Sequence, residues 1–107
     1  MTHRVRIVEE AEYDLLEIFE FIATNDSLVN AENVLDQLEN LCLSLESEPL
    51  RGHTPPELDA IGVKAYREVH FKPYRVIYEV IGREVYIHCI VDGRRDMQKL
   101  LERRLLR

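Results

Sequence analysis

Residues 66–80, YREVHFKPYRVIYEV, contain two segments in which apolar and polar residues alternate. A period of two is typical of β-strands, and the intervening Lys72-Pro73 is short enough for a hairpin turn. Each segment begins with a Tyr-Arg pair, although an arginine is costly to place in a sheet that packs on a core. These arginines therefore either hold the structure together or bind something else.

The rest of the chain also shows clear periodicity. In order, we expect a strand at 2–8, a helix at 9–24, a second helix after the capping residues 25–27, a loop at 49–62, strands at 63–71, 74–80 and 85–91, and a last helix capped by Asp96. Two helices joined by a short turn form an antiparallel hairpin, and three strands with short connections form an antiparallel meander. The predicted fold is therefore α+β with the order β-α-α-β-β-β-α, in which the helical hairpin covers one face of the antiparallel sheet.

The size of the chain predicts a single domain. It has 107 residues, 46% of them hydrophobic, which is enough for one core over 1–107. No apolar run approaches the roughly 18 residues that a membrane span needs, and the N-terminal MTHRVRIVEE lacks the apolar centre of a signal peptide. We therefore expect a cytoplasmic protein, in which Cys42 and Cys89 are small core residues of apolar segments.

Charge is distributed unevenly along the chain. Residues 1–50 carry a net charge of −10 and residues 51–107 carry +4, which together give the −6 of the whole chain. Of the 14 basic residues, 11 are arginine, whose planar guanidinium suits partners such as phosphate or carboxylate. An anionic partner is therefore expected to bind the C-terminal half.

Three arginines are candidates for an anion site. Arg67 and Arg75 share their strand faces with apolar residues. Each must therefore lie at the margin of the sheet, pair with a carboxylate such as Glu68 or Glu79, or point into a cleft awaiting an anion. Arg95 follows the last strand and can either lie in a solvated turn and pair with an acid of the first helix or approach the same edge. Three guanidinium groups there would resemble a phosphate-binding floor.

The histidines offer acid–base chemistry but no evident metal site. His70 and His88 lie in strands, and either could act as an acid or base near neutral pH. His53 lies in the loop and His3 near the N-terminus, and neither has a metal-ligand spacing with other residues. The sequence also has no glycine-rich phosphate loop and no nucleophile elbow. We therefore expect no metal and no cofactor.

Five segments, in order, resemble toxins of the RelE/ParE superfamily from bacterial type II toxin–antitoxin systems, which are often labelled plasmid stabilisation proteins. These segments are AEYDLLEIFEFI at 11–22, EPLRGH at 48–53, YREV at 66–69, PYRVIYEV at 73–80 and VDGRRD at 91–96. The likeness covers nearly the whole chain, and the superfamily fold agrees with the order of elements predicted above. It implies a toxin that arrests growth until a cognate antitoxin masks it in a toxin–antitoxin hetero-oligomer.

The resemblance implies one of two mechanisms. RelE-like members enter the ribosomal A site and cut messenger RNA, whereas ParE-like members are associated with poisoning DNA gyrase. The basic positions of the RelE-like site fall at Arg67, Arg75 and Arg95, which would be catalytic in a ribosome-dependent endoribonuclease. Val69 and Leu101 stand where a lysine and a tyrosine of the RelE type would fall, which favours a ParE-like toxin acting on gyrase. A weakly toxic member that mainly binds its antitoxin is a third alternative.

An antitoxin is expected to cover exposed apolar surface. Leu16 and Phe21 lie off the main core stripe of the first helix and are the candidates there. The last helix is the other candidate element, because its Arg103 and Arg104 would suit an acidic antitoxin segment. These four residues are the predicted antitoxin-binding residues.

Overall fold

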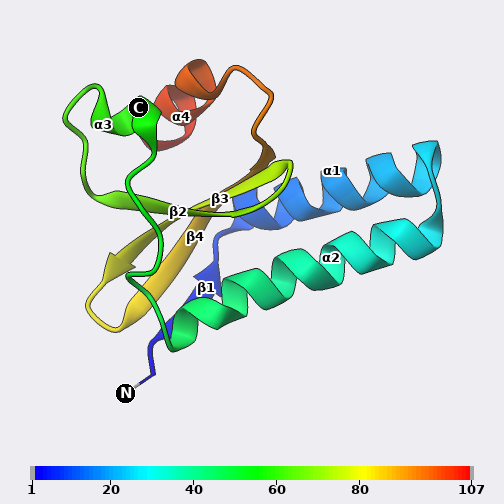
Figure 1. The fold of residues 1–107 in the computed structure, drawn as a ribbon, viewed down its shortest axis with the longest axis horizontal. Helices are drawn as coiled ribbons and strands as arrows, with labels where there is room; N and C mark the ends of the chain where they lie inside the picture. Colours follow the sequence, from blue (N-terminus) through cyan, green and yellow to red (C-terminus); the bar gives the residue numbers. More distant parts are fainter. Residues whose placement is uncertain (1, 107) are drawn as a thin grey trace.

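The computed structural model describes residues 2–106 and shows a four-stranded sheet with helices on both faces (Figure 1). Its elements are β1 (Arg4–Ile7), α1 (Glu9–Asn25), α2 (Leu28–Leu43), the 3₁₀ turn η1 (Ser44–Glu46), α3 (Pro56–Asp59), β2 (Tyr66–Phe71), β3 (Tyr74–Ile81), β4 (Glu84–Asp92) and α4 (Met97–Leu105). The predicted α+β class is confirmed. Within residues 2–106, no helix is long and apolar enough to cross a bilayer.

The strands follow the order β1-β4-β3-β2. β2, β3 and β4 form the predicted antiparallel meander, but β1 pairs with β4 in parallel, with Arg4 opposite Glu84 and Ile7 opposite Ile87. The sheet is therefore mixed rather than wholly antiparallel. The physical reason is that β1 leads into α1 and not into a hairpin turn, so its connection does not force it to run against its neighbour.

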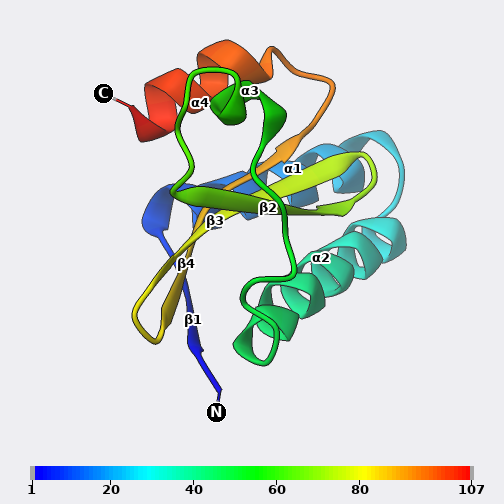
Figure 2. The ribbon, with the colours of Figure 1, turned by 60° about the vertical axis from the view of Figure 1, so that its left-hand side comes forward.

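Helices cover both faces of the sheet. α1 and α2 form the predicted antiparallel hairpin on one face, and α3 and α4 lie together on the other (Figure 2). Val76 and Tyr78 of β3 pack in the core on the hairpin side, whereas Ile77 and Cys89 pack with Leu58 of α3 in the core on the α3/α4 side. The short helix α3 was expected to be loop. It begins at Pro56, whose fixed φ suits a first helical position.

An ion pair lies beside the last residues of β4, where β1 no longer pairs with that strand. β1 ends opposite Ile87, and beyond this point Asp14 of α1 accepts a hydrogen bond of 3.0 Å from the backbone N–H of Ile90. Arg104 of α4 donates to the two oxygens of Asp14 at 3.1 and 2.9 Å and to the carbonyl of His88 at 2.7 Å. The two side chains are only 10% and 8% exposed. This pair therefore joins the two helical layers around the edge of the sheet.

Several local predictions are confirmed by side-chain contacts. Ser27 accepts a hydrogen bond from the backbone N–H of Asn30 at the start of α2, and Asp96 caps α4 in the same way. Cys42 and Cys89 are buried free thiols, one in each core. Burial raises the pKa of each to about 12, which keeps both thiols protonated and unreactive at neutral pH.

Candidate functional site

Residues 49–57, which we call the crossover loop and which include the first two residues of α3, carry the chain from the hairpin side of the sheet to its α3/α4 side. The loop passes β2, which is an edge strand of the sheet (Figure 2). His53 in the loop forms a two-bond backbone bridge with Glu68 of β2, with N···O distances of 3.2 and 2.7 Å. The bridge therefore fixes the middle of the crossover loop to the edge of the sheet.

A buried tyrosine holds the start of the crossover loop. The hydroxyl of Tyr78 donates to the carbonyl of Pro49 at 2.8 Å and accepts from the backbone N–H of Gly52 at 3.0 Å. A Cβ at position 52 would lie 2.7 Å from that hydroxyl oxygen and 2.5 Å from the carbonyl oxygen of Glu68. The loop can approach the sheet this closely because residue 52 is glycine.

Arg67 secures the crossover loop on the hairpin side. Its Nη1 donates to the carbonyl of Leu50 at 3.2 Å and to the carbonyl of Gly52 at 2.6 Å. Val69, two residues further along β2 and thus on the same face, packs in the hairpin-side core. Arg67 therefore binds loop carbonyls at the margin of the sheet.

Arg75 secures the crossover loop from the opposite side. Its Nη1 and Nη2 donate to the two carboxylate oxygens of Glu57 at 2.8 and 2.7 Å, and its Nε donates to Glu68 at 2.6 Å. The side chains of Arg75 and Glu68 are only 12% and 1% exposed. The hydrogen bonds with Glu57 raise the pKa of Arg75 against the effect of burial, and the same bonds lower the pKa of Glu57. Of the alternatives open to this arginine, the structure shows pairing with a carboxylate.

The three arginines predicted as one anion site lie in three places. Arg67 is opposite Tyr78 in the β2–β3 ladder, whereas Arg75 is opposite His70, so their side chains leave opposite faces of the sheet. Arg95 is exposed in the turn after β4 and lines a groove beside α1. A phosphate-binding floor made by all three is not formed in this arrangement, and a catalytic role for any of them stays a prediction.

Two histidines meet at the buried carboxylate of Glu68. The Nε2 atom of His53 lies 3.2 Å from Glu68 Oε2, and the Nε2 atom of His70 lies 3.4 Å from Glu68 Oε1. The centroids of the two rings are 5.4 Å apart. His88, the other strand histidine, lies 3.1 Å from Glu79 instead. Sequence spacing could not reveal the cluster, because only the backbone bridge of the crossover loop brings His53 to Glu68.

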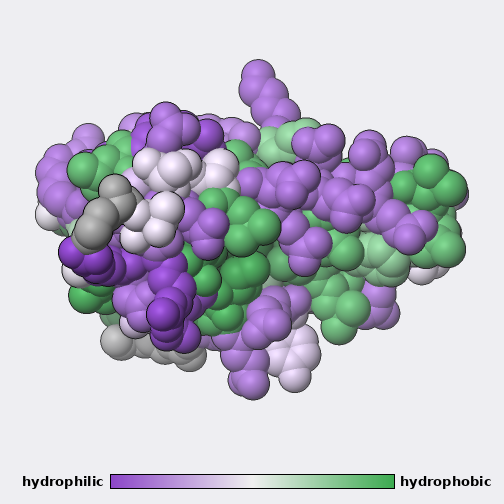
Figure 3. Space-filling view, turned by 90° about the horizontal axis from the view of Figure 1, so that it is seen from below, coloured by the Kyte–Doolittle hydropathy of each residue, from purple (hydrophilic) through white to green (hydrophobic). Residues whose placement is uncertain are grey.

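A groove of about 450 Å³ lies between α1 and the end of β4, and we call it the α1–β4 groove. Its lining includes Ile18, Phe21 and Ile22 of α1, Ile90 of β4, and Arg94 and Arg95 of the following turn. The hairpin that forms one wall exposes further apolar side chains, and Figure 3 shows hydrophobic residues along its surface. Asp14, Glu17 and Asp92 also line it, so the groove combines apolar surface with charged groups of both signs. It places two predicted functional residues, Phe21 and Arg95, on one surface.

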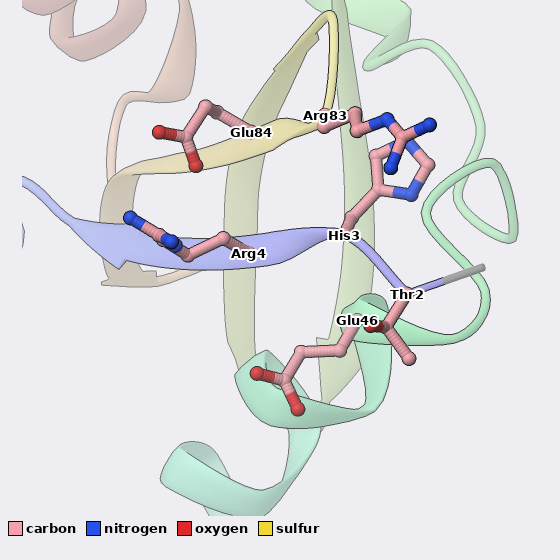
Figure 4. Close-up of a pocket in the computed structure, with 6 residues that line it drawn as sticks. All are labelled: Thr2, His3, Arg4, Glu46, Arg83 and Glu84. Carbon is pink, nitrogen blue, oxygen red and sulfur yellow. The ribbon is translucent and has the colours of Figure 1, made fainter.

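A second hollow, of about 530 Å³, lies where β1 begins. Thr2, His3, Arg4, Glu46, Arg83 and Glu84 line it (Figure 4). Its two arginines and two glutamates balance in charge, and the side chains spread around the opening without converging on one point. It therefore has no group of side chains arranged to hold a particular ligand.

A match to a protein-family model shows which family this chain belongs to. Residues 5–97 match the family model described as ParE toxin of type II toxin–antitoxin system, parDE. The chain belongs to the ParE toxin family. This ParE-family protein is thus a toxin of a type II system, and the superfamily resemblance of the sequence is confirmed. No curated protein sequence matches the chain.

Solved structures of toxins share the fold of this ParE-family protein. A chromosomal ParDE system from P. aeruginosa aligns with a TM-score of 0.71 at 17% identity, covering 85% of this chain and 96% of that one. The RelBE2 toxin–antitoxin complex from Mycobacterium tuberculosis aligns at 0.64 and 18% identity, covering 86% and 99%. A RelE mutant from E. coli in the free state aligns at 0.66 and 14% identity, covering 99% and 100%. At these identities the likeness establishes the fold.

The predicted antitoxin-binding residues of this ParE-family toxin divide into two groups. Leu16 and Phe21 are exposed on α1, by 50% and 68%, and Arg103 is exposed on α4. Arg104 is instead buried against Asp14, so it is not a free cation for an acidic antitoxin segment. Sequence reasoning missed this pair because Asp14 and Arg104 lie near opposite ends of the chain and meet only through the fold.

Proposed function

We propose that this protein is a ParE-like toxin that arrests growth by binding DNA gyrase and that a cognate antitoxin neutralises it. The observation that carries the proposal is the match to the ParE toxin family over residues 5–97. In this proposal the chain is a single toxin domain, acts in the cytoplasm where gyrase is found, and is stored as a toxin–antitoxin hetero-oligomer. No chemical step on a substrate is required of it.

The arrangement of the arginines supports a binding function over RNA cleavage. A phosphate site needs guanidinium groups that are free to meet the anion. Arg75 is held by Glu57 and Glu68, and Arg67 is held by two loop carbonyls on the other face of the sheet. Arg95 is the exposed member of the predicted set. Two of the three thus have internal partners that account for their presence in the sheet.

The α1–β4 groove is the surface we propose for the antitoxin. Phe21 is 68% exposed at this groove, and a large exposed aromatic side chain beside an apolar depression is typical of a protein interface. Arg95 at the rim adds a positive charge that an acidic side chain can meet. An amphipathic antitoxin segment with apolar residues toward Ile18 and Phe21 and an acid toward Arg95 would fit both features.

Expression in bacteria tests the proposed function. The chain is produced alone or together with its antitoxin, growth is followed, and the ends of messenger RNA are mapped before and after induction. The proposal predicts arrest without new messenger ends, and recovery with the antitoxin gene but not with a copy that carries an early stop codon. New ends at codons in the ribosomal A site would contradict it. Normal growth without antitoxin would indicate that this protein is a weakly toxic family member that mainly binds its antitoxin.

A RelE-like endoribonuclease is the second candidate, and one observation favours it. His53 and His70 are exposed imidazole side chains, and both lie at Glu68 beside Arg75. In that case, replacing His53 and His70 with glutamine would abolish messenger cleavage while the protein remains folded. In the ParE-like mechanism the same double variant would still arrest growth.

A further inference from the structure

The cluster of His53, Glu68 and His70 has the donor groups of a metal site. A ring nitrogen from each histidine and a carboxylate oxygen of Glu68 offer ligand atoms that all lie within 4.8 Å of one another. Two histidines and one glutamate form a ligand set that holds Zn²⁺ with one coordination position left open. Both rings are exposed, by 61% and 42% of their side chains, so an ion can reach the site from solvent.

The distances between these atoms suit an ion placed among them. With bonds of about 2.0–2.1 Å in a tetrahedral arrangement, neighbouring ligand atoms lie roughly 3.3 Å apart. His53 Nε2 lies 3.2 Å from Glu68 Oε2, and His70 Nε2 lies 3.4 Å from the other carboxylate oxygen, Oε1. Each ring can move its proton to Nδ1 and leave Nε2 for the ion, because neutral imidazole exists as two tautomers.

The backbone fixes the three donors before any ion arrives. His53 is bound to Glu68 by its two-bond bridge, and His70 follows two residues along β2, so its side chain leaves the same face. Arg75 donates to Glu68 Oε1 at 2.6 Å and so orients the carboxylate, as partners of metal-binding carboxylates do. A preformed arrangement of this kind loses little freedom when it binds.

The charge of the surrounding cluster also favours a cation. Arg75 contributes one positive charge, and the two carboxylates hydrogen-bonded to it, Glu57 and Glu68, contribute two negative charges. The group of Arg75, Glu57 and Glu68 therefore carries a formal net charge of −1. From this and the donor geometry, we propose that His53, Glu68 and His70 bind a divalent transition-metal ion such as Zn²⁺. The ion would fasten the crossover loop to the edge of the sheet, independently of the toxin's target.

Zinc titration of the full chain, produced without a histidine tag, tests this site. Isothermal titration with Zn²⁺ in competition with a chelator is expected to give one ion per chain. His53→Gln and His70→Gln should each weaken binding by at least about tenfold, since changes even behind the ligands of a metal site have effects of this size. The matched control is His88→Gln, because His88 also lies beside a carboxylate, Glu79, at 3.1 Å, but away from this cluster. The Zn²⁺ affinity of the His88→Gln variant should stay within about twofold of the affinity of the unaltered chain.

Two further measurements exclude trivial explanations. Circular dichroism checks that the glutamine variants are folded, which is expected because both rings are largely exposed. Co²⁺ in place of Zn²⁺ should give the visible absorption of a tetrahedral site in the unaltered chain and lose it in His53→Gln. The proposal is overturned if the double variant of His53 and His70 binds Zn²⁺ as tightly as the unaltered chain, or if His88→Gln weakens binding equally. In that event the two histidines only form hydrogen bonds with Glu68.

Discussion

Arg75 and Glu57 meet at two points, with N···O distances of 2.8 and 2.7 Å between β3 and α3. The remaining Nε of Arg75 donates to the buried Glu68. Together with the bonds of Arg67 to loop carbonyls, these contacts explain why two arginines stand in the sheet. They hold opposite sides of the crossover loop, at a point where the edge of β2 would otherwise be open to solvent.

Arg75→Ala should destabilise the protein strongly. The substitution leaves the carboxylate of Glu68, only 1% exposed, without its cationic partner, and breaking a buried ion pair costs about 3–5 kcal/mol. Urea unfolding followed by circular dichroism measures the change. Arg94→Ala is the control, because Arg94 is 79% exposed and pairs with Asp92 at the surface, so its effect on the free energy of unfolding should be small. An Arg75→Ala variant of full stability that has lost toxicity would indicate an anion site instead.

Acid should remove the contribution of Glu57 to stability. Arg75 lowers the pKa of Glu57 in the folded protein, so its contribution is fully present above the unfolded pKa of about 4.3. The contribution is lost as the pH falls through the lower, folded pKa. We therefore expect Glu57→Gln to be less stable than the unaltered chain at pH 7, with a difference that shrinks toward pH 3. A difference that is constant over this range would mean that the ionisation of Glu57 is not responsible.

The buried pair of Asp14 and Arg104 should behave as one unit. Arg104→Ala leaves the buried carboxylate of Asp14 without its cation and should cost about 3–5 kcal/mol. Asp14→Ala should cost less, because Arg104 keeps Glu10 at 3.5 Å, and the double variant should lose less than the sum of the two. Urea unfolding of the unaltered chain and of all three variants gives the coupling free energy between Asp14 and Arg104. Arg103→Ala, on the exposed face of α4, is the control and should have little effect. If Arg104→Ala keeps its stability but binds antitoxin weakly, the original assignment of Arg104 to the antitoxin surface is correct.

Phe21→Ser should weaken antitoxin binding without unfolding the toxin. Phe21 lines the α1–β4 groove and is 68% exposed, so its loss removes interface area but little core. Aromatic anchors of interfaces are typically worth about 2 kcal/mol or more, which corresponds to at least tenfold in Kd. Tyr13→Ser is the matched control, because Tyr13 is a similarly exposed aromatic residue of α1 outside the groove. Equal losses of antitoxin affinity in Phe21→Ser and Tyr13→Ser would argue against the groove as the docking site.

Local patterns predicted the elements well, and long-range contacts explain what they missed. The alternation in YREVHF and YRVIYEVI and the short turn between them predict the hairpin of β2 and β3, because a hairpin depends on neighbouring residues. Exposure of Leu16 and Phe21 also followed from the helical stripe of α1. The direction of β1 did not follow, since no local signal links it to β4.

The candidate site shows the same limit. Strand alternation placed Arg67 and Arg75 on their own strand faces but not relative to each other, and the β2–β3 ladder puts them on opposite faces. The bridge from His53 to Glu68 joins a loop to an edge strand, and no periodicity anticipates such a contact. Tertiary contacts of this kind decide which charged side chains remain free, which is the information that a functional assignment needs most.

A DNA supercoiling assay shows whether this toxin acts on DNA gyrase. The full chain, freed from its antitoxin, is added to purified DNA gyrase with relaxed plasmid and ATP, and supercoiled product is measured as toxin is titrated and then as antitoxin is added back. If gyrase is the target, supercoiling falls with increasing toxin and returns when antitoxin is present in excess. Supercoiling that is unchanged by a toxin preparation known to arrest growth would contradict gyrase as the target.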